Sequence, residues 1–237
     1  MEAKKGRRKM KKFELTTESI TNVAGKKLFR IKALIDFEDV KAGELGGYVE
    51  KEGNVSQDGN AWVSGNAKVF GDARISGNAR ISGDAWISDN AKVFDDARVS
   101  GNAWVFGNAW VSGNAWISGD ARISGNAWIF GNAKVSGDAE VSGDAEVSGN
   151  AKVSDDAEVF DDADYALVQG FGTEFRCTTF YRGKNKKIMV NCGCFHGDLE
   201  EFRKQVKETR NGKIAKEYLM IADLMEYHFT GEGSDDE

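Results

Sequence analysis

The sequence predicts a mainly β fold in which a long parallel β-solenoid carries a small cap at each end. Three observations support this prediction: a six-residue period runs through the middle of the chain, glycine is abundant, and proline is absent. The 237 residues include 28 Gly and 0 Pro. This composition does not match collagen or a proline-rich linker, and it suits a fold that turns tightly at regular intervals.

The period is carried by units that read Gly/Asp, Asn/Asp, Ala, variable, Val/Ile, Ser/Phe. Alanine recurs every six residues from Ala61 to Ala163, which makes eighteen units, and Val or Ile follows two residues later from Val63 to Val159. In extended backbone the Ala and the Val/Ile point to one side and the variable residue to the other. Each unit then turns at Gly-Asn or Gly-Asp. Because one unit buries too little surface to be stable, successive coils must stack.

Two weaker units, at residues 47–49 and 53–55, precede the regular ones. The pattern over residues 47–164 resembles the hexapeptide repeat of left-handed parallel β-helix proteins, in which three units make one triangular coil. The resemblance implies a left-handed hexapeptide solenoid of about six to seven coils. The lead-in from Glu44 to Ser56 is similar to that of YdcK-like and prophage-encoded hexapeptide proteins, most of which have no established activity.

The flanks of the repeat predict two caps. Residues 13–46 read as short strands, notably 27–35, that cover the first coil. Residues 175–181 and 187–191 alternate like a hairpin around Gly183-Lys184-Asn185. Two amphipathic helices then follow, which gives a ββαα cap. The expected organisation is a basic disordered leader at 1–12, a β cap at 13–46, the solenoid at 47–164, the α+β cap at 165–230 and an acidic tail at 231–237.

The first predicted helix has a capping box made by Asp198 and Glu201, and Leu199, Phe202 and Val206 lie on one of its faces. Asn211-Gly212 is expected to end it before the second helix.

The variable position faces solvent, and reading it every eighteenth residue gives three vertical ladders. The first ladder is Trp62, Arg80, Arg98, Trp116, Lys134 and Lys152. The second is Lys68, Trp86, Trp104, Arg122, Glu140 and Glu158. The third is Arg74, Lys92, Trp110, Trp128, Glu146 and Asp164.

All six tryptophans of the chain therefore point outward, and Trp104, Trp110 and Trp116 girdle one coil. Exposed aromatic patches mark contact sites, and Trp is enriched in interface hot spots. The candidate partner-binding residues are Trp86, Trp104, Trp110, Trp116, Trp128, Phe94, Phe106 and Phe130. A candidate acidic surface comprises Glu140, Glu146, Glu158 and Asp164. The alternative interpretation is that the ladders only brace the solenoid through ring stacking and cation–π contacts.

The repeats offer no evident catalytic chemistry. Enzymes of the resembled fold use a histidine base for acyl transfer or three histidines on zinc, and this chain has only His196 and His228, both beyond the solenoid. We therefore expect no enzyme and no cofactor. A degenerate hexapeptide acyltransferase and a purely structural scaffold are the alternatives.

One metal site is worth testing in the C-terminal cap. Cys177, Cys192, Cys194 and His196 would converge if the hairpin set Cys177 opposite Cys192, and four such ligands suit tetrahedral zinc. The Cys-x-Cys-x-His spacing is not that of a zinc finger, and buried reduced thiols are common.

Charge and hydropathy limit the classes of partner that the sequence predicts. The net charge is −6, but residues 1–12 carry seven Lys/Arg and one Glu, which leaves nucleic acid open through the leader. The coils from 59 to 130 balance six basic against six acidic residues, which disfavours nucleic acid there. With no apolar signal or membrane segment and three cysteines, we expect a cytoplasmic protein.

The expected function is that of a non-catalytic binding protein. We expect it to engage a protein partner and to form a homo-oligomer, either a dimer or a trimer. The prophage resemblance implies a host protein as that partner, for example a defence nuclease such as a CRISPR effector that the protein would inhibit.

Overall fold

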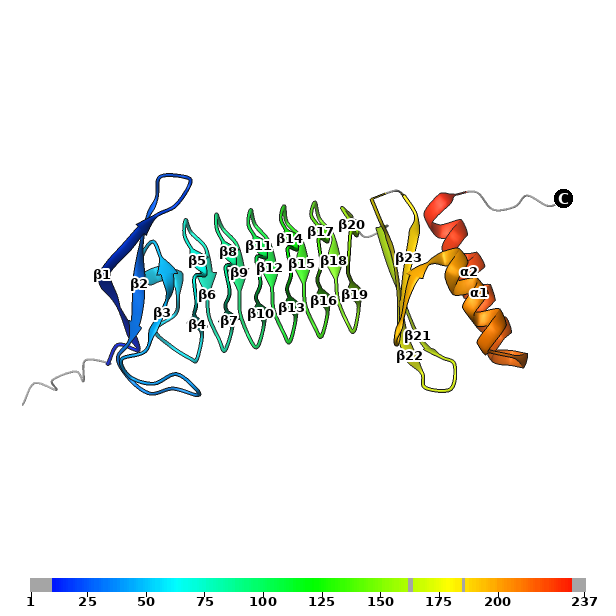
Figure 1. Cartoon of the computed structure of the whole chain (residues 1–237), viewed down its shortest axis with the longest axis horizontal. Helices are drawn as coiled ribbons and strands as arrows, with labels where there is room; N and C mark the ends of the chain where they lie inside the picture. The colour runs from blue at the N-terminus through cyan, green and yellow to red at the C-terminus, as the bar shows by residue number, and fades with distance from the viewer. Residues whose placement is uncertain (1–9, 162–163, 185, 232–237) are drawn as a thin grey trace, which may run out of the picture.

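The computed structural model describes residues 10–161, 164–184 and 186–231. A small sheet, a solenoid and an α+β module follow one another along the long axis of the molecule (Figure 1). Most of the expected basic leader, the acidic tail after Gly231, Ala163 of the last repeat and Asn185 of the hairpin lie outside the described residues.

The solenoid consists of three parallel sheets built from two-residue strands, and each strand pairs with the strand eighteen residues along the chain. Trp104, for example, lies in register with Trp86 on one side and Arg122 on the other. Three units therefore make one coil, as the family resemblance implies. The first face has six strands, which corresponds to about six coils. The left-handed sense stays a prediction of the resemblance.

We number the three faces by the ladders they carry. The first face comprises β4 (Trp62–Val63), β7 (Arg80–Ile81), β10 (Arg98–Val99), β13 (Trp116–Ile117), β16 (Lys134–Val135) and β19 (Lys152–Val153). The second comprises β5 (Lys68–Val69), β8 (Trp86–Ile87), β11 (Trp104–Val105), β14 (Arg122–Ile123), β17 (Glu140–Val141) and β20 (Glu158–Val159). The third comprises β6 (Arg74–Ile75), β9 (Lys92–Val93), β12 (Trp110–Val111), β15 (Trp128–Ile129) and β18 (Glu146–Val147).

The interior is a column of alanine and Val/Ile side chains. Every repeat Ala and Val/Ile from Ala61 to Val159 is at most 1% exposed. The corners need left-handed backbone: Gly113 has a φ of 65°, and a Cβ on it would lie 2.9 Å from the backbone nitrogen of Gly131 in the next coil. Asp89, Asp95 and Asp155 adopt the same conformation, which Asp tolerates better than most residues. The interior and corner assignments of the sequence are confirmed.

The corners also carry polar ladders that the sequence analysis did not anticipate. Side-chain amides donate from coil to coil, from Asn90 to Asn108 at 3.1 Å, from Asn108 to Asn126 at 3.0 Å and from Asn126 to Asp144 at 2.8 Å. The amide group can donate to one coil and accept from another, so these columns satisfy the corner side chains along the axis.

The N-terminal cap extends the second face. Strands β1 (Phe13–Thr21), β2 (Lys27–Ala33) and β3 (Leu45–Val49) are antiparallel to each other, and β3 then pairs in parallel with β5. The 3₁₀ turn η1 (Glu52–Asn54) follows.

Two side chains just outside the expected cap at 13–46, those of Lys12 from the expected leader and Asn54 of η1, satisfy backbone carbonyls of the first coil. The Nζ of Lys12 donates to the carbonyl of Ala61 at 2.8 Å, and the Nδ2 of Asn54 donates to that of Ala73 at 2.9 Å. The expected cap therefore covers the open end of the solenoid.

The cap also corrects one outward tryptophan. Trp62 is only 2% exposed, because Phe37 and Phe13 pack against its ring edge-on at centroid distances of 5.5 and 6.4 Å. It belongs to the core, whereas the other five tryptophans stay on the surface of the coils.

The C-terminal module has more strands than the ββαα prediction allowed. Its antiparallel sheet contains β21 (Tyr165–Phe171), β22 (Arg176–Arg182), β23 (Ile188–Cys192) and β24 (Phe195–Asp198). The hairpin of β22 and β23 is confirmed, and β21 and β24 were missed. β21 ends in Gln-Gly-Phe and β24 reads Phe-His-Gly-Asp, so neither shows a complete strand alternation.

Helices α1 (Leu199–Thr209) and α2 (Gly212–Thr230) cover the far side of this sheet (Figure 1). The capping box is confirmed, with Glu201 N donating to Asp198 Oδ1 at 2.9 Å. The expected break at Asn211-Gly212 is confirmed, because α1 ends at Thr209 with Arg210 as its C-cap and Asn211 is the N-cap of α2. Neither helix of the described chain is long and apolar enough to cross a membrane.

Candidate interaction surface

The second and third faces each carry a pair of stacked tryptophans. The rings of Trp86 and Trp104 lie 5.2 Å apart at an interplanar angle of 8°, and those of Trp110 and Trp128 lie 5.1 Å apart at the same angle. The spacing follows from the parallel register, which sets residues eighteen apart on neighbouring strands. Trp104 and Trp128 are 42% and 43% exposed, so each stack presents an indole ring to solvent.

Phenylalanines at the corners extend both stacks. Phe70 packs edge-on against Trp86 at 5.9 Å, and Phe94 packs edge-on against Trp110 at 5.8 Å. On the third face these side chains leave a mainly apolar groove of about 210 Å³, lined by Phe94, Trp110, Ser112, Trp128 and Phe130.

Cations lie against both stacks. The Nζ of Lys92 is 4.3 Å from the centroid of Trp110, and that of Lys68 is 5.3 Å from Trp86. On the second face the Arg122 guanidinium adds a longer contact of 5.8 Å to Trp104. These contacts stabilise the rings in place, so each face is an ordered aromatic surface rather than a set of loose side chains.

Trp104, Trp110 and Trp116 surround one coil as predicted, one on each of the three sheets, so they face three different directions. Trp116, on the first face, is 46% exposed and stands between Arg98 and Lys134 with no tryptophan beside it. The candidate aromatic residues therefore separate into a second-face group and a third-face group, with Trp116 alone on the first face.

A family comparison identifies the repeat. The sequence model of the YdcK beta solenoid repeat matches residues 73–89 and 97–113. These coils therefore carry a β-solenoid repeat similar to that of YdcK. Each matched segment is about one coil long, residues 90–96 separate the two, and together they contain Trp86, Trp104 and Trp110. No curated protein matches the chain.

The acidic end of the YdcK-type solenoid is confined to the last coils. Glu140 and Glu158 are register neighbours on the second face, and Glu140 lies 3.4 Å from the Arg122 guanidinium. Glu146 is exposed next to Trp128 on the third face. Asp164 does not belong to this surface: its side chain is 15% exposed, pairs with Arg182 at 2.8 Å and accepts the Phe160 N–H.

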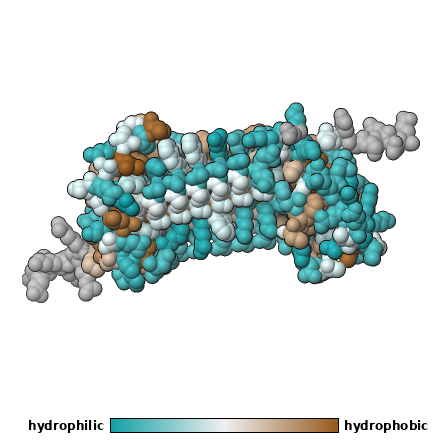
Figure 2. Space-filling view, in the orientation of Figure 1, coloured by the Kyte–Doolittle hydropathy of each residue, from teal (hydrophilic) through white to brown (hydrophobic). Residues whose placement is uncertain are grey.

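On the side of the solenoid seen in Figure 2, hydrophobic side chains gather over the N-terminal cap and the C-terminal module. The coils between them present hydrophilic and neutral side chains on that side. Among the described coil residues, the large hydrophobic side chains that are clearly exposed are all aromatic, namely Trp104, Trp116, Trp128 and Phe160.

The proposed zinc cluster does not form. Thr178, not Cys177, pairs with Cys192, so the hairpin is shifted by one residue and the side chains of Cys177 and Cys192 point to opposite sides of the sheet. Burial also raises the pKa of the Cys177 thiol, which disfavours the thiolate that zinc requires. Among the described residues no group of three or more His, Cys, Asp or Glu side chains could hold a metal ion.

His196, the fourth proposed ligand, instead joins the module to the YdcK-type solenoid. Its Nε2 lies 2.8 Å from Asp155 Oδ2 and 3.1 Å from the Tyr181 hydroxyl. Asn191 Nδ2 donates to the carbonyl of Lys152 at 3.0 Å and to the Tyr181 hydroxyl at 3.1 Å. Burial raises the pKa of Tyr181 to about 12, so its hydroxyl stays neutral. Sequence reasoning missed this junction because its members are distant along the chain.

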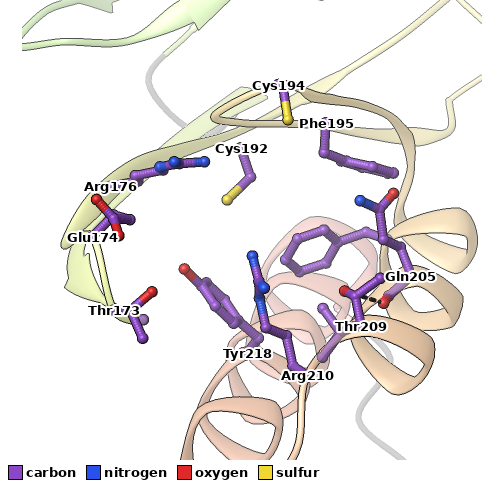
Figure 3. Close-up of a pocket in the computed structure, with 13 residues that line it drawn as sticks. Thr173, Glu174, Arg176, Cys192, Cys194, Phe195, Gln205, Thr209, Arg210 and Tyr218 are labelled. Atoms are coloured by element: carbon purple, nitrogen blue, oxygen red, sulfur yellow. Dashed lines mark hydrogen bonds between the residues drawn. The ribbon is translucent and has the colours of Figure 1, made fainter.

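A small cavity lies between the module's sheet and its helices (Figure 3). Arg176, Arg210, Cys192 and Tyr218 are among its lining residues, and burial raises the pKa of Tyr218. Its volume is about 70 Å³, far below the roughly 300–1,000 Å³ of ordinary small-molecule sites. The cavity has room for a few water molecules or a small anion, so the aromatic faces are the stronger candidate site.

Proposed function

We propose that the protein is a non-catalytic binding protein whose aromatic solenoid faces contact a protein partner. The observation that carries the proposal is the pair of parallel tryptophan stacks on neighbouring faces, each with one indole more than 40% exposed. Rings held in fixed positions lose little conformational freedom on binding, which is the property that makes Trp a frequent hot-spot residue.

The chemistry of the faces supports a binding role over catalysis. The residues around the third-face groove are aromatic or serine, and the solenoid contains no histidine to act as a general base. A degenerate acyltransferase would still bind its acyl donor. We expect no heat of binding with acetyl-CoA by calorimetry, and a measurable affinity would favour that enzyme alternative.

Charge supports a particular class of partner. Glu140, Glu146 and Glu158 make the last coils acidic next to the aromatic stacks. An acidic and aromatic surface complements a basic protein surface, such as the one with which a nuclease holds its substrate. Together with the resemblance to prophage-encoded hexapeptide proteins, this favours a host defence nuclease as the partner.

The test is affinity purification from host cells with three forms of the full chain. These are the original protein, the double variant Trp86→Ser/Trp104→Ser, and the matched control Arg98→Ser on the first face. We expect a partner that the control retains and the double variant loses, while circular dichroism shows both variants folded. Equal capture by all three forms would refute binding through the second-face stack.

A further inference from the structure

The outward side chains of the third face, taken in order along the axis, complement the same side chains taken in reverse order. In register along the axis the order is Arg74, Lys92, Trp110, Trp128, Glu146. The four residues centred on the midpoint between Trp110 and Trp128 are therefore a cation, a ring, a ring and an anion. The same face of an inverted copy reads anion, ring, ring, cation, so Lys92 and Glu146 each meet the opposite charge, and Arg74 lies outside this set of four.

The corner next to these residues alternates in size. It reads Phe94, Ser112, Phe130, Ser148 along the axis. Consider a second copy related by a twofold axis that runs parallel to the strands between β12 and β15. Each column of side chains then packs against the same column of the second copy in reverse order. Phe94 then lies opposite Ser148 of the second copy, and Phe130 lies opposite Ser112. Large side chains therefore face small ones, and the groove of about 210 Å³ has room beside Ser112 for the incoming ring.

The second face lacks this property although its stack is the same. Reversal about the midpoint of Trp86 and Trp104 places Lys68 opposite Arg122, two like charges at the edge of the aromatic contact. Like charges brought together at an interface oppose association.

The first face repels its own copy more strongly. Four of its six ladder residues are basic and none is acidic, and Trp62 at its start is buried. Its first coils also lie beside the loop that carries Glu38 and Asp39, both of which pair with Arg80. Of the three faces, the third is the one whose charges and side-chain sizes match their own reverse.

We infer that the third face binds a second copy of this chain in an antiparallel, twofold-symmetric dimer. This rests on the proposed function, that stacked tryptophan faces contact protein, and it names the partner of one face. The twofold axis repeats each contact, so the dimer contains two Lys92–Glu146 pairs and two Trp110–Trp128 contacts. Lys92 lies 4.3 Å from its own Trp110, which holds its ammonium at the border of the aromatic patch.

The test is sedimentation velocity of the full chain over a concentration series, with charge reversal. Lys92→Glu and Glu146→Lys each turn two attractive pairs into two repulsive ones, and we expect each to raise the dimer Kd at least about tenfold. The double variant Lys92→Glu/Glu146→Lys restores opposite charges and should return the Kd to the original value. Arg98→Glu, with the same charge change on the first face, should leave the Kd unchanged.

The tryptophans supply a second, charge-independent pair of variants. Trp128→Ser should dissociate the dimer, whereas Trp104→Ser, which removes an equally exposed ring from the second face, should not. Thermal unfolding checks that each variant is folded.

A monomeric original protein at every concentration, or a double charge variant that stays dissociated, would overturn the antiparallel dimer. So would equal effects of Arg98→Glu and Lys92→Glu. In each case the proposed function stands or fails separately, because its test uses the second-face tryptophans and a different protein. A dimer that survives Trp128→Ser but is lost with Trp104→Ser would also refute the third face as the interface.

Discussion

The second and third faces of the solenoid are alike inside and different outside. Both bury one Ala and one Val/Ile per coil, and both carry tryptophan stacks with the same 8° ring angle. They differ in the residues that flank the stack, which are Lys68 and Arg122 on one face and Lys92 and Glu146 on the other. The repeat thus determines the framework, and the variable residue and the Ser/Phe residue of each unit determine what each face can contact.

The largest effect we predict tests the shared interior. Ile123 lies under the second face and Ile129 under the third, and both are 0% exposed. Each Ile→Ala change removes buried methyl groups and leaves a cavity, so each should lower the free energy of unfolding by about 2–5 kcal/mol. The two losses should agree within about 1 kcal/mol, measured by denaturant unfolding.

The conservative variants Ile123→Val and Ile129→Val serve as controls and should cost about 0.5–1.5 kcal/mol each. If one face tolerated Ile→Ala without loss while the other did not, the interiors would not be equivalent and the comparison would fail.

The interior and the ladders could be predicted from the sequence because the repeat is local. A period of six with an inner period of two specifies which side chain points inward, and eighteen residues per coil specifies which outward residues are neighbours. The neighbours Trp86 and Trp104, and Trp110 and Trp128, follow from the period of six together with the three units per coil that the family resemblance implies.

The errors came from contacts that cross the repeat boundary. Trp62 is buried because Phe37 packs on it from the N-terminal cap, and Asp164 turns to Arg182 of the C-terminal sheet. No period specifies such contacts. The zinc hypothesis failed on a register shift of a single residue between β22 and β23, which moves a side chain to the other side of a sheet. The ring angles and the groove depend on side-chain conformations, which the period does not specify.

The next largest predicted effect is the contribution of each tryptophan stack to the stability of the monomer, separate from its role in association. Trp104→Ser and Trp128→Ser each remove one ring of a stacked pair, and aromatic pairs contribute about 0.5–1.5 kcal/mol beyond burial. Measured at a concentration where the chain is monomeric, the two variants should lose similar amounts of unfolding free energy. A difference above about 1 kcal/mol would show that one stack braces the solenoid more than the other.

The smallest effect concerns the cations that lie on the stacks. Lys92 Nζ lies 4.3 Å from the Trp110 ring, whereas the Arg122 guanidinium lies 5.8 Å from Trp104 and is shared with Glu140. Cation–π attraction at exposed sites is about 0.5–1 kcal/mol and weakens with distance. In the monomer, Lys92→Gln should therefore reduce stability by about 0.5 kcal/mol and Arg122→Gln by less, measured by denaturant unfolding at low salt. Equal losses of unfolding free energy, or a larger loss for Arg122→Gln, would mean that the Glu140 ion pair outweighs the cation–π contact. The two faces would then differ in what stabilises them as well as in what they can bind.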